Sequence, residues 1–349
     1  MKKSLIALAV LAASGVASAQ STVTMYGLLD AYFGNTKATG PAQTGISQTV
    51  VNSGGLQTSR WGLKGSEDLG GGLMANFQLE TGFNIDAGTV PNNGPTNQTL
   101  FSRQSWVGLS GGLGVVKVGK MWTPFDEVKG SGAAAFDANI FSPATNVWAS
   151  NGYNDRPGNA LYYSTPSFGG FTGAAMYSFS ENKSATQSAG KVASFNVAYA
   201  GGAAAAALSY QTEKLGGNAG AGLPTTKFTQ LNGSYDFGVV KLLGAYGRVK
   251  DGFGPIQSAL RVAKSTEYQL GLDVPVTSLL TVSGGYAHSK DTQLAGGPDI
   301  KRRGYGLAGL YALSRRTNLY AGLQQAKETE AGLAETKIRT YAAGIRHTF

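Results

Sequence analysis

The stretch Glu267-Tyr268-Gln269-Leu270-Gly271-Leu272-Asp273-Val274 alternates apolar and polar side chains along its length. Tyr268, Leu270, Leu272 and Val274 have one parity, whereas Glu267, Gln269 and Asp273 have the other. Successive side chains of a β-strand point to opposite faces. This alternation therefore predicts a strand with one apolar face and one polar face.

The same alternation recurs along the rest of the chain. In residues 75–80, for example, Ala75, Phe77 and Leu79 lie on one face and polar side chains on the other. We count sixteen such segments and expect each to form a strand. They are 22–35, 57–68, 73–86, 99–110, 114–122, 159–166, 171–181, 191–201, 203–213, 226–237, 239–250, 263–274, 277–290, 302–313, 316–327 and 336–349.

The connections between these segments are of two kinds. Those after even-numbered segments have four residues or fewer, such as Pro275-Val276 and Ser314-Arg315. An even number of antiparallel strands, with short turns at one end and long loops at the other, is typical of an outer-membrane β-barrel. A soluble β-sandwich or propeller does not predict this alternation of loop lengths. The long connections are 36–56, 87–98, 123–158, 182–190, 214–225, 251–262, 291–301 and 328–335.

The composition excludes two other classes of protein. Of 349 residues, 51 are glycine, 35 are aromatic and none is cysteine, and the mean hydropathy is −0.10. Beyond the N-terminus, no apolar run approaches the ~18 residues that a membrane-spanning helix needs. The abundance of aromatic residues and the scarcity of charges exclude a disordered chain. A barrel with an apolar outside and a polar lumen gives this near-neutral average, and it pairs the backbone groups that hydrocarbon cannot solvate.

The N-terminus has the features of a secretory signal peptide. Met1-Lys2-Lys3 is followed by an apolar stretch from Leu5 to Ala13 and by Ala17-Ser18-Ala19. These are a basic region, a core too short to span a membrane, and a cleavage site. We expect residues 1–19 to be removed and residues 20–349 to form one barrel domain. The formal net charge then falls from +9 to +7, because Lys2 and Lys3 are lost.

Several motifs, taken in order, resemble those of the trimeric general porins of Gram-negative bacteria, particularly of β-proteobacteria. One is Arg103-Gln104-Ser105-Trp106-Val107-Gly108-Leu109, and another is the C-terminal Gly344-Ile345-Arg346-His347-Thr348-Phe349. The motifs extend from the first predicted strand to the last, so the resemblance covers the mature chain. The others are Val23–Asp30, Ser59–Leu73, Ser164–Phe171 and Tyr311–Tyr320.

The resemblance implies a sixteen-stranded, water-filled barrel that assembles as a homotrimer and lets small hydrophilic solutes and ions diffuse passively. It also implies that the third long loop, 123–158, folds inward and narrows the pore. We expect the barrel to contact the lipid bilayer and lipopolysaccharide, and to be inserted by the outer-membrane assembly machinery. We expect no cofactor, no metal and no nucleic-acid partner.

Selectivity in such a channel needs fixed charges that face a narrow aqueous passage, where low-dielectric walls strengthen their field. Parity places Arg60 and Lys64 on the lumen side. It does not settle Arg103, which shares its parity with apolar residues, or Lys120, which lies where a strand gives way to the long loop. For the basic wall, the resemblance implies Arg60, Arg103 and Lys120.

Acidic candidates lie on a lumen face and in the long loop: Glu80, Asp126, Glu127 and Asp137. Our hypothesis is a transverse field between a basic wall and these acids, with a preference for anions. The alternative is that all of them are ordinary solvated charges away from the narrowest point. The loop begins Thr123-Pro124-Phe125-Asp126-Glu127 and lacks the Pro-Glu-Phe-Gly-Gly signature of the enterobacterial branch, so which acid lines the narrowing stays open.

The last segment ends in an apolar stripe formed by Tyr341, Ile345 and Phe349. This pattern predicts a closing strand that faces lipid. The resemblance further implies that this end is the signal that the assembly machinery recognises.

Signals for other functions fail. Gly114–Lys120 imitates a phosphate-binding loop, but Met121 replaces the Ser/Thr that would bind Mg²⁺. His288 and His347 are the only histidines, which argues against zinc sites and Cys–His catalysis. A substrate-specific outer-membrane channel is the nearest alternative. A barrel enzyme lacks a catalytic triad here, and a barrel adhesin would need longer or repetitive loops.

Overall fold

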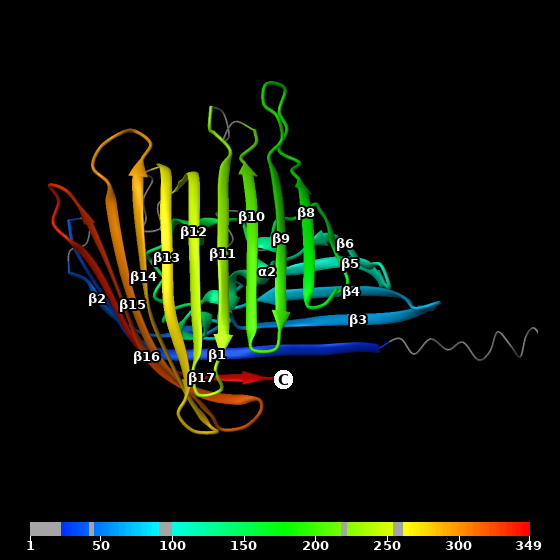
Figure 1. Ribbon diagram of the computed structural model, residues 1–349, viewed down its shortest axis with the longest axis horizontal. Helices are drawn as coiled ribbons and strands as arrows, with labels where there is room; N and C mark the ends of the chain where they lie inside the picture. Colours follow the sequence, from blue (N-terminus) through cyan, green and yellow to red (C-terminus); the bar gives the residue numbers. More distant parts are fainter. Residues whose placement is uncertain (1–21, 42–44, 91–99, 218–221, 254–260) are drawn as a thin grey trace, which may run out of the picture.

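The computed structural model describes residues 22–41, 45–90, 100–217, 222–253 and 261–349. In these residues seventeen strands form one antiparallel sheet, which closes because β1 pairs with β17 as well as with β2 and β3. Figure 1 shows β8 to β13 upright, with longer loops at the top and short turns below, whereas β1, β3, β4 and β5 run across the view. The strands are β1 (Thr22–Thr39), β2 (Ser47–Ser53), β3 (Arg60–Gly70), β4 (Leu73–Gly82), β5 (Gln104–Gly111), β6 (Gly114–Lys120), β7 (Ala160–Ser164), β8 (Phe171–Phe179), β9 (Lys191–Gly201), β10 (Ala204–Lys214), β11 (Thr226–Asp236), β12 (Lys241–Phe253), β13 (Arg261–Pro275), β14 (Leu280–Gln293), β15 (Ile300–Ala312), β16 (Thr317–Glu330) and β17 (Thr336–Thr348).

The extra strand, β2, corrects the prediction that residues 36–56 are all loop. β2 pairs with residues 31–37 of β1, and β3 pairs with residues 22–28 along the same edge. The two strands therefore fill one position in the barrel, which has the sixteen positions expected.

The side chain of buried Asp30 holds in place the segment that separates β2 from β3. Its carboxylate accepts hydrogen bonds from the backbone N–H groups of Gly55 (3.0 Å), Leu56 (2.9 Å) and Gln57 (2.8 Å). The hydroxyl of Tyr320 donates to the same carboxylate. Through these hydrogen bonds, Asp30 holds residues 54–59 against the barrel wall.

The two faces of the strands differ as the alternation predicts. On β13, Glu267 and Gln269 are buried against the lumen contents, whereas Leu270 is 67% exposed on the outer face. Large apolar side chains are exposed on the outer face of many strands, as expected for a surface that lipid covers. Among the described residues, no helix is both long and apolar enough to cross a membrane.

The segment between β6 and β7 lies inside the barrel, as expected for the third long loop (Figure 1). It contains α2 (Pro124–Lys129) and three short turns of 3₁₀ helix, η1 (Gly130–Gly132), η2 (Ala135–Asp137) and η3 (Ala149–Gly152). Residues 121–159 are called the inward loop.

Polar side chains on the lumen face hold the inward loop to the wall. Asn232 of β11 donates to the carbonyl of Val128 (2.5 Å), and Gln269 of β13 donates to that of Gly132 (2.9 Å). On β13, Glu267 accepts from the backbone N–H of Ser150 at 3.0 Å. The polar face of the strands therefore supplies the hydrogen bonds that a buried loop backbone needs.

Glycines on β15 let the loop backbone approach the wall closely. A Cβ at Gly304 would collide with the carbonyl oxygen of Pro143, and one at Gly306 would collide with that of Phe141. Part of the high glycine content thus makes room for the inward loop.

Candidate functional site

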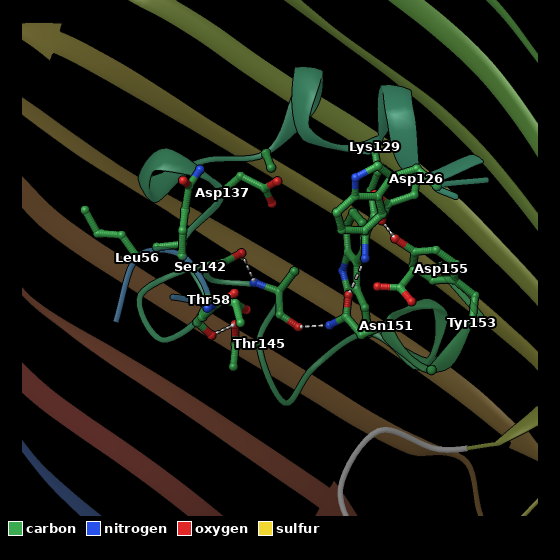
Figure 2. Close-up of a pocket in the computed structure, with 18 of the residues that line it drawn as sticks. Leu56, Thr58, Asp126, Lys129, Asp137, Ser142, Thr145, Asn151, Tyr153 and Asp155 are labelled. Carbon is green, nitrogen blue, oxygen red and sulfur yellow. Dashed lines mark hydrogen bonds between the residues drawn. The ribbon is translucent and has the colours of Figure 1, made fainter. Parts of the chain in front are cut away.

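A cavity of about 700 Å³ lies between the inward loop and the barrel wall. Figure 2 shows Asp126, Lys129, Tyr153 and Asp155 of the inward loop on the right of the view. Thr58, which lies shortly before β3, is on the left. The charged residues that line the cavity are Arg60, Arg103, Asp126, Lys129, Asp137, Asp155 and Arg156.

Two of the predicted basic residues meet on the wall around one acid. The Nε atom of Arg103 lies 2.6 Å from Oε1 of Glu80, and Nε of Arg60 lies 3.7 Å from its Oε2. Tyr26 also donates to Glu80, at 3.0 Å. Glu80 therefore belongs to the basic wall, where it neutralises one of two cations, and it does not face that wall from the acidic side as hypothesised.

Trp122 and Arg156 extend this basic group beyond the residues that the sequence predicted. The guanidinium carbon of Arg156 lies 3.9 Å from the centroid of the Trp122 ring, and that of Arg103 lies 5.3 Å from the same ring. Guanidinium groups are attracted to aromatic faces. Trp122 therefore holds Arg103 and Arg156 near one another, although their charges repel. Arg156 also pairs with Asp155 at 2.8 Å.

The acidic side of the cavity belongs to the inward loop. Burial raises the pKa of Asp126 to about 6, an effect that its hydrogen bond from Tyr153 only partly offsets. Burial also raises the pKa of Asp137. Lys129 lies between these acids, where its ammonium is 4.7 Å from the centroid of the Tyr153 ring and donates to Asn151 (2.9 Å).

Three other predicted residues lie away from the cavity. Lys64 is exposed elsewhere along β3, 5.3 Å from the centroid of the Tyr26 ring. The ammonium of Lys120 donates to the carbonyl of Arg156. Glu127 accepts from the hydroxyl of Tyr162 at 2.9 Å, on the side of α2 that faces the wall. Burial raises the pKa of Glu127.

Arg103 reaches the lumen because its strand begins later than predicted. The expected segment 99–110 gave Arg103 the parity of the apolar face, but β5 begins at Gln104 and residue 99 lies outside the described residues. Arg103 therefore precedes the strand, and alternation does not apply to it. Lys129 and Arg156 lie in the irregular inward loop, where no period could have found them.

The C-terminal stripe lies on the outer face of β17. Tyr341 is 53% exposed, Ile345 46% and Phe349 42%. The backbone of Phe349 pairs with Gly27 in both directions at 3.1 Å, which extends the closing strand pair to the last residue.

The cavity presents fixed charges to an aqueous space. Within the described ranges, no group of three or more His, Cys, Asp or Glu residues could hold a metal ion. Such fixed charges raise the local concentration of ions of opposite sign and repel those of like sign.

Comparisons with known proteins agree with this geometry. The model of a family described as Gram-negative porin matches residues 5–331. The chain is 36% identical to outer membrane porin protein 32 of Delftia acidovorans, over 99% of this chain and 95% of that protein. It is 34% identical to an outer membrane porin protein of Bordetella pertussis, over the full length of both.

Solved structures give the same result. The anion-selective porin from Comamonas acidovorans superposes with a TM-score of 0.75 at 30% identity, covering 94% of this chain and all of that one. A loop-deletion form of OmpT from Vibrio cholerae superposes with a TM-score of 0.70 at 18% identity, covering 94% of this chain and 99% of that one, which supports the fold alone. The chain is therefore a passive channel of the outer membrane and not an enzyme, and it belongs to the Gram-negative porin family.

Proposed function

We propose that this porin prefers anions and that the cavity between the inward loop and the wall is its selective constriction. Of the predicted basic residues, the proposal retains Arg60 and Arg103, and it adds Arg156 and Lys129. The loop acids Asp126 and Asp137 form the acidic side, whereas Asp155 pairs with Arg156 at 2.8 Å.

The observation that carries the proposal is the grouping of three arginines on one side of the cavity. Arg60 and Arg103 share a single acid, Glu80, and the guanidinium groups of Arg103 and Arg156 both lie over the ring of Trp122. The loop acids are more weakly ionised than ordinary carboxylates, because burial raises the pKa of Asp126 and of Asp137. Cations and acids of the site are equal in number when Glu80 is included, so the proposed preference rests on the grouping of the arginines and on the raised pKa values of these two loop acids. That the anion-selective porin from Comamonas acidovorans shares the fold at 30% identity supports the same preference.

Solute uptake into liposomes that contain the purified protein tests this function. A small dicarboxylate should enter faster than a diamine of equal size, and both rates should rise linearly with concentration. Equal rates, or faster entry of the diamine, would contradict the anion preference. Saturation at low concentration would instead support a substrate-specific channel.

The same proposal includes the partners and processing expected from the sequence. We propose a homotrimer in a bilayer whose outer leaflet contains lipopolysaccharide, and cleavage of residues 1–19, which lie outside the described residues. We also propose that the assembly machinery recognises Phe349, Ile345 and Tyr341. The exposure of all three on the outer face supports their availability for recognition.

A further inference from the structure

A cluster of cations lies on the outer face of the barrel, near the ends of β11, β12 and β13 that carry the long loops. Lys227, Lys250 and Lys264 stand opposite one another across these three neighbouring strands, because Lys227 pairs with Lys250 and Lys250 with Lys264. Arg248 lies two residues from Lys250 on the same face. These four residues are called the outer basic patch.

These side chains point outward, because the residues of the other parity on the same strands face the lumen. On β11, Phe228 packs on Phe125 of the inward loop, and Asn232 bonds the loop backbone. On β13, Glu267 bonds Ser150 of the same loop. These residues face the lumen, so the outer basic patch, whose members have the alternate parity, faces away from it.

None of the four cations forms an ion pair within the described part of the chain. The adjoining loop residues 218–221 and 254–260, which lie outside that part, contain no Asp or Glu. Like charges directly opposite one another on a sheet are destabilising. A row of three lysines without acidic partners in the described residues therefore favours the binding of an anion from outside the chain.

The surface below the patch is apolar and could accommodate the acyl chains of a lipid. A groove of about 550 Å³ runs from Lys227, Arg248 and Lys250 to Leu208, Tyr210, Leu231 and Tyr246. Tyr246 pairs across the strands with Tyr268, and Leu270 continues the apolar surface downward. Tyrosines at this level mark the interface of the membrane, with the acyl-chain region beneath them.

Outward cations are distributed unequally around the barrel. Beyond the patch, outward cations lie on β9, β10, β14 to β17 and β1, each opposite another outward residue in the register: Lys191, Lys214, Lys290, Lys301, Arg303, Lys327, Lys337, Arg339 and Lys37. On β3 to β8, the cations Arg60, Lys64 and Lys117 face the lumen, and Lys120 bonds the carbonyl of Arg156. The patch itself holds cations only, so charge complementarity favours an anionic partner.

We infer that the outer basic patch binds the phosphate groups of a phosphorylated lipid in the outer leaflet, with the acyl chains of that lipid on the tyrosines and leucines below. This inference rests on the proposed contact with lipopolysaccharide and names its site. It does not depend on the ion preference of the pore.

Binding of purified lipopolysaccharide to the full-length protein in detergent tests the inference, with K227Q/K250Q/K264Q as the variant. Each cation near an anionic lipid surface contributes a factor of about five, so the variant should bind roughly a hundredfold more weakly. Wild-type protein should bind lipopolysaccharide from which the phosphates have been removed more weakly than intact lipopolysaccharide, by a similar factor. Unchanged affinity in either arm would overturn the inference, as would competition by millimolar inorganic phosphate, which would indicate a site for the free ion.

The matched control is K241Q/R315Q/R316Q, which removes the same charge from the end of the barrel with the short turns. It should bind lipopolysaccharide like the wild type, and an equal loss there would show that overall charge, not the patch, sets the affinity. Conductance and ion preference of K227Q/K250Q/K264Q should match the wild type and so report correct folding. If the wild-type pore lacks anion preference but the patch still binds phosphorylated lipid, only the proposed function fails.

Discussion

Replacement of Arg60 by glutamine should shift the ion preference of the channel toward cations. Arg60 lines the cavity with a side chain that is about a quarter exposed, and its nearest acid is 3.7 Å away. The group of Arg60, Arg103 and Glu80 carries a net charge of about +1, which the R60Q substitution cancels. Arg103 keeps its 2.6 Å contact with Glu80, so the variant leaves no buried acid without a partner.

The magnitude follows from Coulomb's law. For an ion that passes about 6 Å from the guanidinium in a water-like dielectric, loss of the charge raises the energy of an anion by ~0.7 kcal/mol and lowers that of a cation equally. The ratio of anion to cation permeability should therefore fall roughly tenfold at low salt, and by less as salt screens the charge.

The reversal potential across a planar bilayer under a KCl gradient measures this ratio. K183Q is the matched control, because Lys183 is exposed in the loop between β8 and β9 and the substitution changes the net charge of the chain equally. An R60Q channel with the reversal potential of the wild type would refute the reasoning, and so would an equal shift in K183Q.

The remaining predictions concern the same cavity, the loop that forms it and the C-terminus. E80Q should shift the reversal potential opposite to R60Q, because it removes the one acid between Arg60 and Arg103; a shift in the same direction would show that Glu80 acts through structure. Burial raises the pKa of Asp126 to about 6, so its negative charge is present above that pH and lost below it. Anion preference should therefore increase between about pH 7 and about pH 5, and D126N should remove most of this dependence. G304V should displace the inward loop from β15 and raise or destabilise the single-channel conductance, whereas G309V, on the outer face with only Leu280 near, should not. Deletion of Phe349 should lower the yield of assembled protein in the membrane without changing the conductance of the channels that form.

Most of the barrel could be predicted from the sequence, because one physical rule applies to every strand. Lipid requires an apolar residue at each second position, and that period is visible in stretches such as 267–274. The break between β2 and β3 could not be predicted in this way, because it depends on contacts between Asp30 and residues 55–57 that are distant in sequence.

The site was less accessible to sequence reasoning, for a related reason. Parity found Arg60, which lies on a strand, but it did not settle Arg103, which precedes one. It placed Glu80 on the lumen face but could not show that Glu80 pairs with arginines of the same wall. Arg156 and Lys129 lie in the inward loop, whose path is set by hydrogen bonds from lumen residues such as Asn232 and Gln269. These contacts join residues far apart in the sequence, so no local sequence pattern predicts them.

The most direct test of the central claim is the reversal potential of the wild-type protein in a planar bilayer with a KCl gradient. The three grouped arginines predict a reversal potential displaced toward the chloride equilibrium potential, in channels that close in three equal steps. A displacement toward the potassium equilibrium potential would contradict the anion preference, and the absence of any conductance would contradict the channel itself.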